Sequence, residues 1–222
     1  MNDNASDKTV DSLPPQLAEY ARQFDAILER FEALISGLDA NAFNWSPDDK
    51  TWSVGQIIEH LCMVDRGYLR GVERAIEKAL AEGVAGDGRE VRFRLFERIF
   101  ISTTEPPPRF KVPAPKVVVP PSELDMAACC DLYRETQSQL RDLVRQAGPV
   151  HLGKARLKSP ISSLLKLGVG ATFGLLAAHN RRHLWQAENL MKRSGFPASS
   201  ESPATESQLT ERSLTEKTPG VY

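Results

Sequence analysis

The sequence has few of the features that stabilise small secreted domains or bind polyanions. Its 222 residues include only three cysteines, two of them adjacent at positions 129 and 130. An odd, partly adjacent set does not form a disulfide framework, so we expect reduced thiols and a cytoplasmic protein. Lysine and arginine total 28 against 29 aspartates and glutamates, without the basic excess of a nucleic-acid-binding protein. Nucleic acid is therefore not an expected partner.

Long apolar runs are also missing. The longest stretch without a charged residue or histidine covers residues 167–178, which is too short to cross a bilayer that needs about 20 residues. Residues 1–8 are polar and acidic, unlike a signal peptide. We therefore expect no membrane partner.

Both ends of the chain are predicted to be disordered tails. Residues 1–12 and 197–222 are polar and contain few apolar side chains, so burial cannot offset the entropy lost on ordering them. One domain is expected over residues 13–196. A chain of this length can bury a core without a structural metal.

Apolar residues recur every three or four positions in four long segments, as in amphipathic helices. One of these helices starts with a capping box formed by Ser53 and Gln56. Four such helices in one domain predict an all-α four-helix bundle. The predicted helices cover residues 14–36, 53–81, 122–148, with Ser122 as N-cap, and 162–193.

The connection between the second and third helices is long and rich in proline. A short helix is expected near residues 91–100, and seven of the 15 prolines follow between residues 106 and 121. Such a connection is uncommon in a compact bundle, and it suggests a lid or a strap across the surface.

Two histidines lie on the apolar stripe of the last helix. His179 and His183 are one i,i+4 step apart, so their rings project together and can hold one metal ion. Asn180 stands where zinc proteases with this spacing have a glutamate, which excludes that class. His60 flanks the buried stripe of the second helix and is the candidate third ligand, whereas Cys62, about 200° around the helix, should point away.

A purely structural role for these histidines is the competing interpretation. An inward histidine is often a hydrogen-bonded core residue, and a His-x-x-x-His pair also arises by chance. However, burying three imidazoles without a cation or matching acceptors costs about 1–3 kcal/mol each. This cost favours a common partner for the three rings.

Two segments resemble the DinB-like metalloprotein superfamily. They are Thr-Trp-Ser-Val-Gly-Gln-Ile-Ile-Glu-His-Leu at 51–61 and Ala-Ala-His-Asn-Arg-Arg-His-Leu-Trp-Gln-Ala-Glu at 177–188. Lys-Val-Pro-Ala-Pro-Lys at 111–116 is also similar to many members. The resemblance covers about residues 14–195.

This resemblance implies an up-down-down-up bundle with a divalent metal at one end. Carried over by position, the ligands are His60, His179 and His183. Three protein ligands with a water in the fourth place are typical of a catalytic site. Zinc, nickel and iron all accept imidazole, so the ligand set does not select among them.

The resemblance implies several functions, because related branches include thiol S-transferases that use bacillithiol or mycothiol, maleylpyruvate isomerase-like enzymes and hydrolases. The first hypothesis is a metal-dependent hydrolase or thiol S-transferase that acts on a small-molecule substrate or thiol cosubstrate. The second is a non-catalytic metal- or ligand-binding module related to stress. The third is a bundle with structural histidines that binds a partner. The sequence does not decide whether the protein forms a homodimer.

Other polar residues near the candidate ligands have competing roles. Gln186, three residues after His183, either orients an imidazole or a bound water, or lies on the helix surface. Glu59 and Glu188 point away from the neighbouring ligands and are not expected to be bases.

Several cationic and aromatic residues have both structural and functional interpretations. Arg181 and Arg182 are expected to form surface pairs or to anchor the proline-rich strap. Trp52 and Trp185 are expected in the core or in a hydrophobic staple rather than as substrate platforms. Four arginines in the connection could bind the carboxylates of a thiol cosubstrate, but a solvated charged surface is the favoured interpretation. They are Arg89, Arg92, Arg94 and Arg98.

Overall fold

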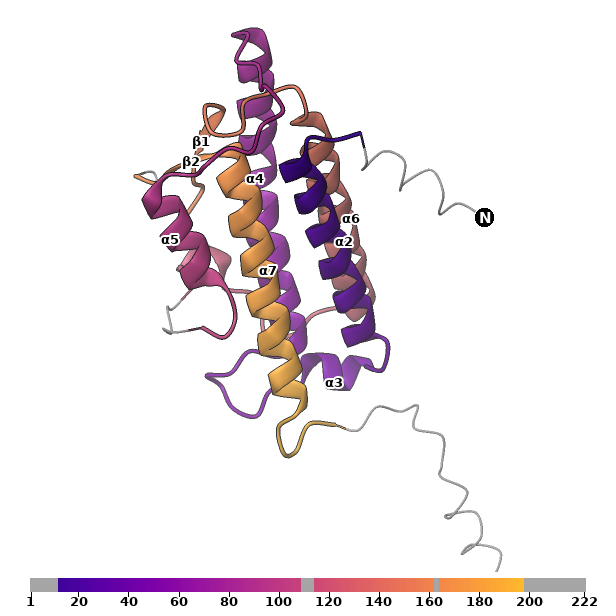
Figure 1. The fold of residues 1–222 in the computed structure, drawn as a ribbon. Coiled ribbons are helices and arrows are strands. Elements are labelled where there is room, and N and C mark those ends of the chain that lie inside the picture. The colour runs from indigo at the N-terminus through magenta and orange to yellow at the C-terminus, as the bar shows by residue number, and fades with distance from the viewer. Residues whose placement is uncertain (1–11, 109–113, 162–163, 198–222) are drawn as a thin grey trace, which may run out of the picture.

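A computed structural model describes residues 12–108, 114–161 and 164–197 (Figure 1). The predicted tails, 1–12 and 197–222, lie almost entirely outside these ranges. Four long helices pack side by side, each against two of the others. In Figure 1, α2 and α7 run from top to bottom, whereas α4 and α6 run from bottom to top. The expectation of a mainly helical protein is confirmed. The long helices are α2 (Pro15–Ile35), α4 (Val54–Ala81), α6 (Met126–Gln146) and α7 (Val169–Met191).

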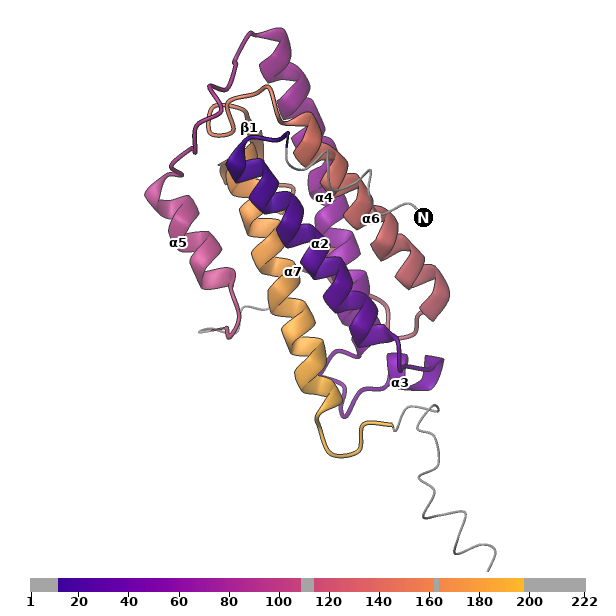
Figure 2. The same ribbon diagram turned by 45° about the vertical axis from the view of Figure 1, so that its right-hand side comes forward.

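The predicted starts and apolar stripes of the first two long helices are confirmed. Pro15 begins α2, where a missing amide hydrogen has no cost. At α4, the Ser53 hydroxyl accepts a hydrogen bond from the Gln56 amide at 3.1 Å, and the Gln56 side chain accepts one from the Ser53 amide at 3.0 Å. Both stripes are buried, and α2 lies between α7 and α6 in Figure 2. This packing fixes the position of α4 relative to α7.

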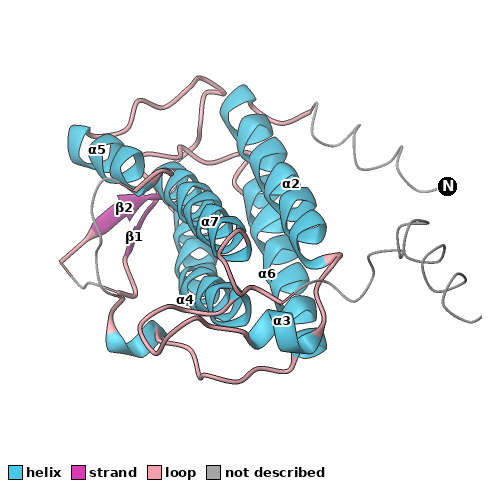
Figure 3. Ribbon diagram, turned by 90° about the horizontal axis from the view of Figure 1, so that it is seen from below, coloured by secondary structure: helices cyan, strands magenta, loops and turns pink. Residues whose placement is uncertain are grey.

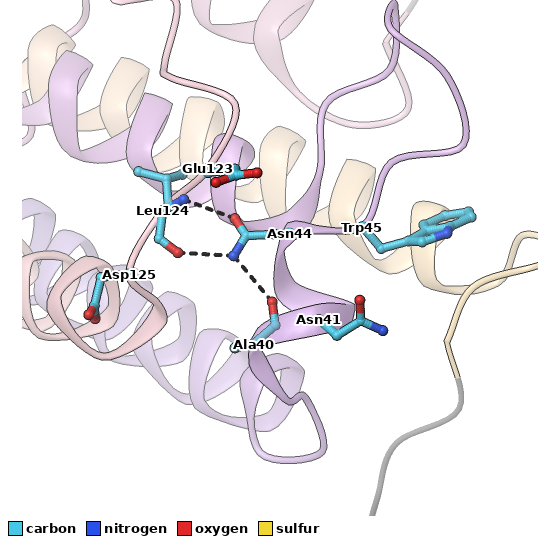
Figure 4. Close-up of a pocket in the computed structure, with 7 residues that line it drawn as sticks. All are labelled: Ala40, Asn41, Asn44, Trp45, Glu123, Leu124 and Asp125. Carbon is cyan, nitrogen blue, oxygen red and sulfur yellow. Dashed lines mark hydrogen bonds between the residues drawn. The ribbon is translucent and has the colours of Figure 1, made fainter.

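The start predicted for α6 at Ser122 is wrong. The helix begins at Met126, because the Asp125 carboxylate caps it by accepting a hydrogen bond from the Ala128 amide at 2.9 Å. The preceding residue, Leu124, is held outside the helix by a side chain from α3 (Ala40–Asn44). The Asn44 amide group donates to the Leu124 carbonyl at 2.9 Å and accepts from its N–H at 3.1 Å (Figure 4).

The start predicted for α7 near Ser162 is also wrong. Two short antiparallel strands precede the helix, β1 (Arg156–Lys158) and β2 (Lys166–Gly168). The predicted helix, residues 162–193, therefore included β2 and Leu165, which lies before β2. A short apolar run has the same pattern in a strand and in a buried helix, so its periodicity does not separate them.

The connection between α4 and α6 contains two further helical segments. The expected short helix is α5 (Leu95–Thr104), and η1 (Lys116–Val118) is a 3₁₀ turn. Seen from below, α5 and the β1–β2 hairpin lie beside α7 (Figure 3). Residues 109–113 of the proline-rich stretch lie outside the described residues. Within the described parts of the chain, no helix is long and apolar enough to cross a membrane.

Replacing Gly55 with alanine should destabilise the protein, although alanine favours helices. A Cβ atom at Gly55 would lie 2.6 Å from Cε1 of the fully buried Phe43, whereas one at exposed Gly67, also in α4, would meet Pro160 at 3.4 Å. In urea titrations, Gly55→Ala should lower the free energy of unfolding by about 1–3 kcal/mol. Gly67→Ala should raise it by about 0.5–1 kcal/mol. Equal stabilisation by both changes would contradict the packing of α3 on α4.

Candidate metal centre

Three histidines from two packed helices converge at one point. His60 lies in the second turn of α4, and His179 and His183 lie on consecutive turns of α7. One ring nitrogen from each histidine lies within 4.8 Å of the other two. The ring centroids are 5.3 Å apart for His60 and His179, 4.8 Å for His60 and His183, and 4.5 Å for His179 and His183. This grouping matches the ligand set expected from the sequence.

Two of the three rings are oriented by hydrogen bonds through Nδ1. The Nδ1 of His60 lies 2.7 Å from the Val118 carbonyl oxygen, which can only accept, so this nitrogen carries the hydrogen. The Nδ1 of His183 lies 3.0 Å from Oε1 of Gln186 and donates in the same way. In both rings Nε2 is then left with a lone pair, as a metal ligand requires.

The third ring contains an unsatisfied polar atom. The Nδ1 of His179 is buried and has no hydrogen-bond partner among the described residues. A buried nitrogen of this kind costs free energy unless a ligand, such as a coordinated cation, bonds to it. Three imidazoles with two fixed orientations and one unsatisfied nitrogen are therefore a donor set that fits a divalent ion of the zinc, nickel or iron type.

Burial keeps the imidazoles neutral. It is the largest cause of the lowered pKa of His60, and it lowers the pKa of His183 to about 3, with the neighbouring His60 adding to the effect. The pKa of His179 falls well below its usual range, first through burial and then through the charges of His183 and His60. Neutral rings can coordinate a cation without first losing a proton.

The indole ring of Trp52 packs against the candidate ligands. The Trp52 ring lies 4.9 Å from the His60 ring and 6.5 Å from the His183 ring, measured between centroids. Trp52 therefore packs directly against two candidate ligands, which its expected core or staple role did not include. His60 is buried, whereas His179 and His183 are half-buried.

The other candidates are engaged elsewhere. Cys62 is not part of the histidine group, in agreement with its predicted direction. Glu59 faces the Cys129 thiol at 3.8 Å, and the Glu188 carboxylate accepts two hydrogen bonds from Arg30, at 2.5 and 2.7 Å. Arg181 pairs with Glu105, immediately before the prolines at 106–108, so it anchors that end of the proline-rich connection.

A buried polar cluster next to the histidines was missed by the sequence analysis. The amide groups of Gln137 and Asn180 both donate to Oδ2 of Asp65, at 3.1 and 2.9 Å. The Tyr133 hydroxyl donates to the Asn180 side chain at 2.7 Å. The available signal was polar residues at stripe positions, since Asp65 follows buried Leu61 by four residues. The cluster joins α4, α6 and α7, and its member Asn180 follows His179 in the sequence.

Asp65 is a neutral acid over part of the physiological pH range. Its carboxyl group is fully buried, and burial raises its pKa to about 7. Its Oδ1 and the Oε1 of Gln137 both have no hydrogen-bond partner among the described residues. A proton on Oδ1 would turn one of these two buried acceptor atoms into a hydrogen-bond donor.

The mainly helical fold and the three convergent imidazoles identify the class of this chain, a helical protein with a candidate histidine metal centre. Within that class the family is shown by comparison. The chain belongs to the DinB superfamily, whose family model matches residues 23–187. No curated protein and no solved structure gave a match.

Removal of one imidazole should abolish metal binding. After reconstitution with zinc, nickel or iron(II), mass spectrometry should find near-stoichiometric metal in the wild type and little in His183→Ala. His151 lies in a loop outside the histidine group, so His151→Ala is the matched control and should keep its metal. Gln186→Ala should bind about 10–100-fold more weakly. Equal metal content in the wild type and His183→Ala would contradict this assignment.

Replacing Asp65 with asparagine should stabilise the protein more at pH 7 than at pH 4. In the unfolded chain the carboxyl ionises near its ordinary pKa of about 3.9, whereas the folded form holds its proton up to about 7. Wild type therefore loses stability as the pH rises through this window, by about 1.4 kcal/mol for each pKa unit. Asparagine carries no charge and escapes this loss.

The measurement is the unfolding free energy of Asp65→Asn and wild type from pH 4 to 7. The exposed Asp142→Asn variant is the baseline. A difference between Asp65→Asn and wild type that is constant or shrinks with rising pH would mean that Asp65 is ionised when folded.

Proposed function

We propose that this protein is a metal-dependent enzyme that transfers a small-molecule thiol to an electrophilic substrate. The observation that carries the proposal is the convergence of three neutral imidazoles, two of them oriented through Nδ1, within 4.8 Å. His60, His179 and His183 would hold the ion. The proposal includes the finer fold expectation, that the four long helices form the up-down-down-up bundle of DinB-like proteins.

The chain's own residues would position the metal ligands and keep them neutral. The capping box at Ser53 fixes the first turn of α4, and the Val118 carbonyl and Gln186 fix the ring directions of His60 and His183. Because His179 and His183 are half-buried, the group is only partly enclosed. This partial exposure would let a small cosubstrate reach a bound ion.

The surrounding carboxylates favour thiol chemistry over hydrolysis. A divalent ion bound here would act as a Lewis acid and lower the pKa of a coordinated thiol or water. Glu59 faces Cys129 and Glu188 pairs with Arg30, so neither carboxylate next to the ligands in sequence is placed as a general base for water. A thiol, with an ordinary pKa near 8.5, needs such a base less than water does. Hydrolysis is the second reaction type.

A thiol should coordinate directly at the cobalt-substituted centre. Cysteine added to the Co²⁺-loaded wild type should produce a sulfur-to-cobalt charge-transfer absorption, and serine, which lacks the thiol, should not. His183→Ala should show neither cobalt binding nor this band, whereas His151→Ala should behave as wild type. With an alkyl halide electrophile, the metal-loaded wild type should then consume free thiol faster than the apoprotein.

The outcomes separate the alternatives. Stoichiometric cobalt without a charge-transfer band for cysteine or any other small thiol tested would overturn the transferase and favour the hydrolase. A centre that binds cobalt but turns over neither thiols nor esters would identify the non-catalytic module. Failure to bind any metal would contradict the whole proposal and leave structural histidines.

A further inference from the structure

The short helix α5 directs its apolar face outward. Leu95, Phe96, Ile99 and Phe100 are 69%, 43%, 54% and 40% exposed. Their spacing of one and four residues places them on one face of the helix. An amphipathic helix on a protein surface normally buries this face, so its exposure needs an explanation.

The opposite face of α5 is firmly held on the protein. Glu97 is only 3% exposed, its carboxylate accepts a hydrogen bond from the Gly168 amide at 3.0 Å, and it pairs with Arg156 at 3.4 Å. Ile101 lies so close to Gly174 of α7 that a Cβ there would meet its Cδ1 at 3.2 Å. The outward apolar face therefore belongs to a docked helix.

Other exposed apolar side chains gather in a few segments outside the four long helices. Nine large apolar side chains are exposed among the described residues, and eight of them belong to α5, to η1 with its following residue, or to the β1–β2 turn. The exception is Leu80, in α4. Figures 1 and 3 place α5 and the hairpin on the left side of the long helices. Beyond the four residues of α5, the set contains Val117, Val119, Ile161 and Leu164, the last 95% exposed.

These segments and the stretches that adjoin them carry an excess of exposed positive charge. Over residues 87–104, 114–119, 154–161 and 164–168, eight cationic side chains are exposed against two exposed carboxylates, Asp87 and Glu90. Asp87 pairs with one of the eight, Arg89, at 3.7 Å. This is a large local excess in a chain whose formal net charge is −1. The eight cations and the eight exposed apolar side chains together are called the basic apolar face. The cations are Arg89, Arg92, Arg94, Arg98, Lys116, Lys154, Lys158 and Lys166.

We infer that the basic apolar face docks on the surface of an anionic lipid bilayer. Phenylalanine, leucine and isoleucine would enter the boundary between headgroups and acyl chains, as in interfacial amphipathic helices. Arginine and lysine would contact the anionic headgroups, whose surface potential attracts them. The charge of the face is complementary to such a surface, and its apolar side chains come from three separate segments, which suits a broad sheet of lipid.

This docking is distinct from spanning the membrane. The expectation of no membrane partner rested on the lack of a long apolar run, and it is revised here because exposure, which the sequence does not give, reveals the outward face of α5. The inference does not depend on the histidine centre. Apoprotein and metal-loaded protein should bind vesicles equally.

Vesicle cosedimentation of the full chain tests the inference. Wild type should sediment with phosphatidylcholine vesicles that contain phosphatidylglycerol but not with pure phosphatidylcholine, and added salt should release it. The double change Phe96→Ser and Ile99→Ser should weaken binding at least tenfold. Leu80→Ser, which removes the exposed leucine outside the face, is the matched control and should bind as wild type.

A second pair of variants tests the charge separately. Changing Arg92 and Arg98 to glutamate should abolish binding to anionic vesicles, whereas Lys50→Glu, at an exposed site elsewhere, should not. Thermal melts establish that each variant is folded. Equal binding to neutral and anionic vesicles, or none to either, would overturn the inference. A wild-type dimer that dissociates on Phe96→Ser and Ile99→Ser without vesicle binding would assign the face to self-association.

Discussion

The placement of three imidazoles side by side, one buried and two half-buried, is the constraint on which the rest of the structure depends. A charged or unpartnered imidazole is costly in an interior, and three adjacent charges would repel one another. The protein keeps His60, His179 and His183 neutral and supplies acceptors to two of them through Val118 and Gln186. One nitrogen from each ring is then available at a common point. This arrangement is disfavoured without a cation and favoured with one.

The grouping of the three histidines could be predicted because helical periodicity converts spacing into direction. His179 and His183 lie on a stripe that is otherwise apolar, and His60 flanks another. The acceptor on His60 could not be predicted, because it is the backbone carbonyl of Val118, brought there by a long connection. The cluster around Asp65 was detectable in principle as polar residues at core positions, but its hydrogen bonds need the relative placement of three helices.

The fold was predicted well where long stripes dominate and poorly where tertiary contacts decide. Helices α2 and α4 have the expected stripes and starts. Strand β2 was mistaken for helix because its pairing with β1 joins residues eight to twelve positions apart, which local periodicity does not reveal. The start of α6 moved because Asn44, far away in sequence, bonds the backbone of Leu124. The exposure of the apolar face of α5 could not be predicted, because periodicity shows that a helix has an apolar face but not whether that face points inward or outward.

X-ray absorption of the zinc-loaded protein tests the central assignment most directly, because it identifies the atoms around the metal. We predict three imidazole nitrogens at about 2.0–2.1 Å, with the outer scattering of their rings, and one further light ligand. Sulfur at about 2.3 Å in the protein without added thiol would instead implicate a cysteine. That result, or a shell of oxygens without imidazole scattering, would contradict the three-histidine centre.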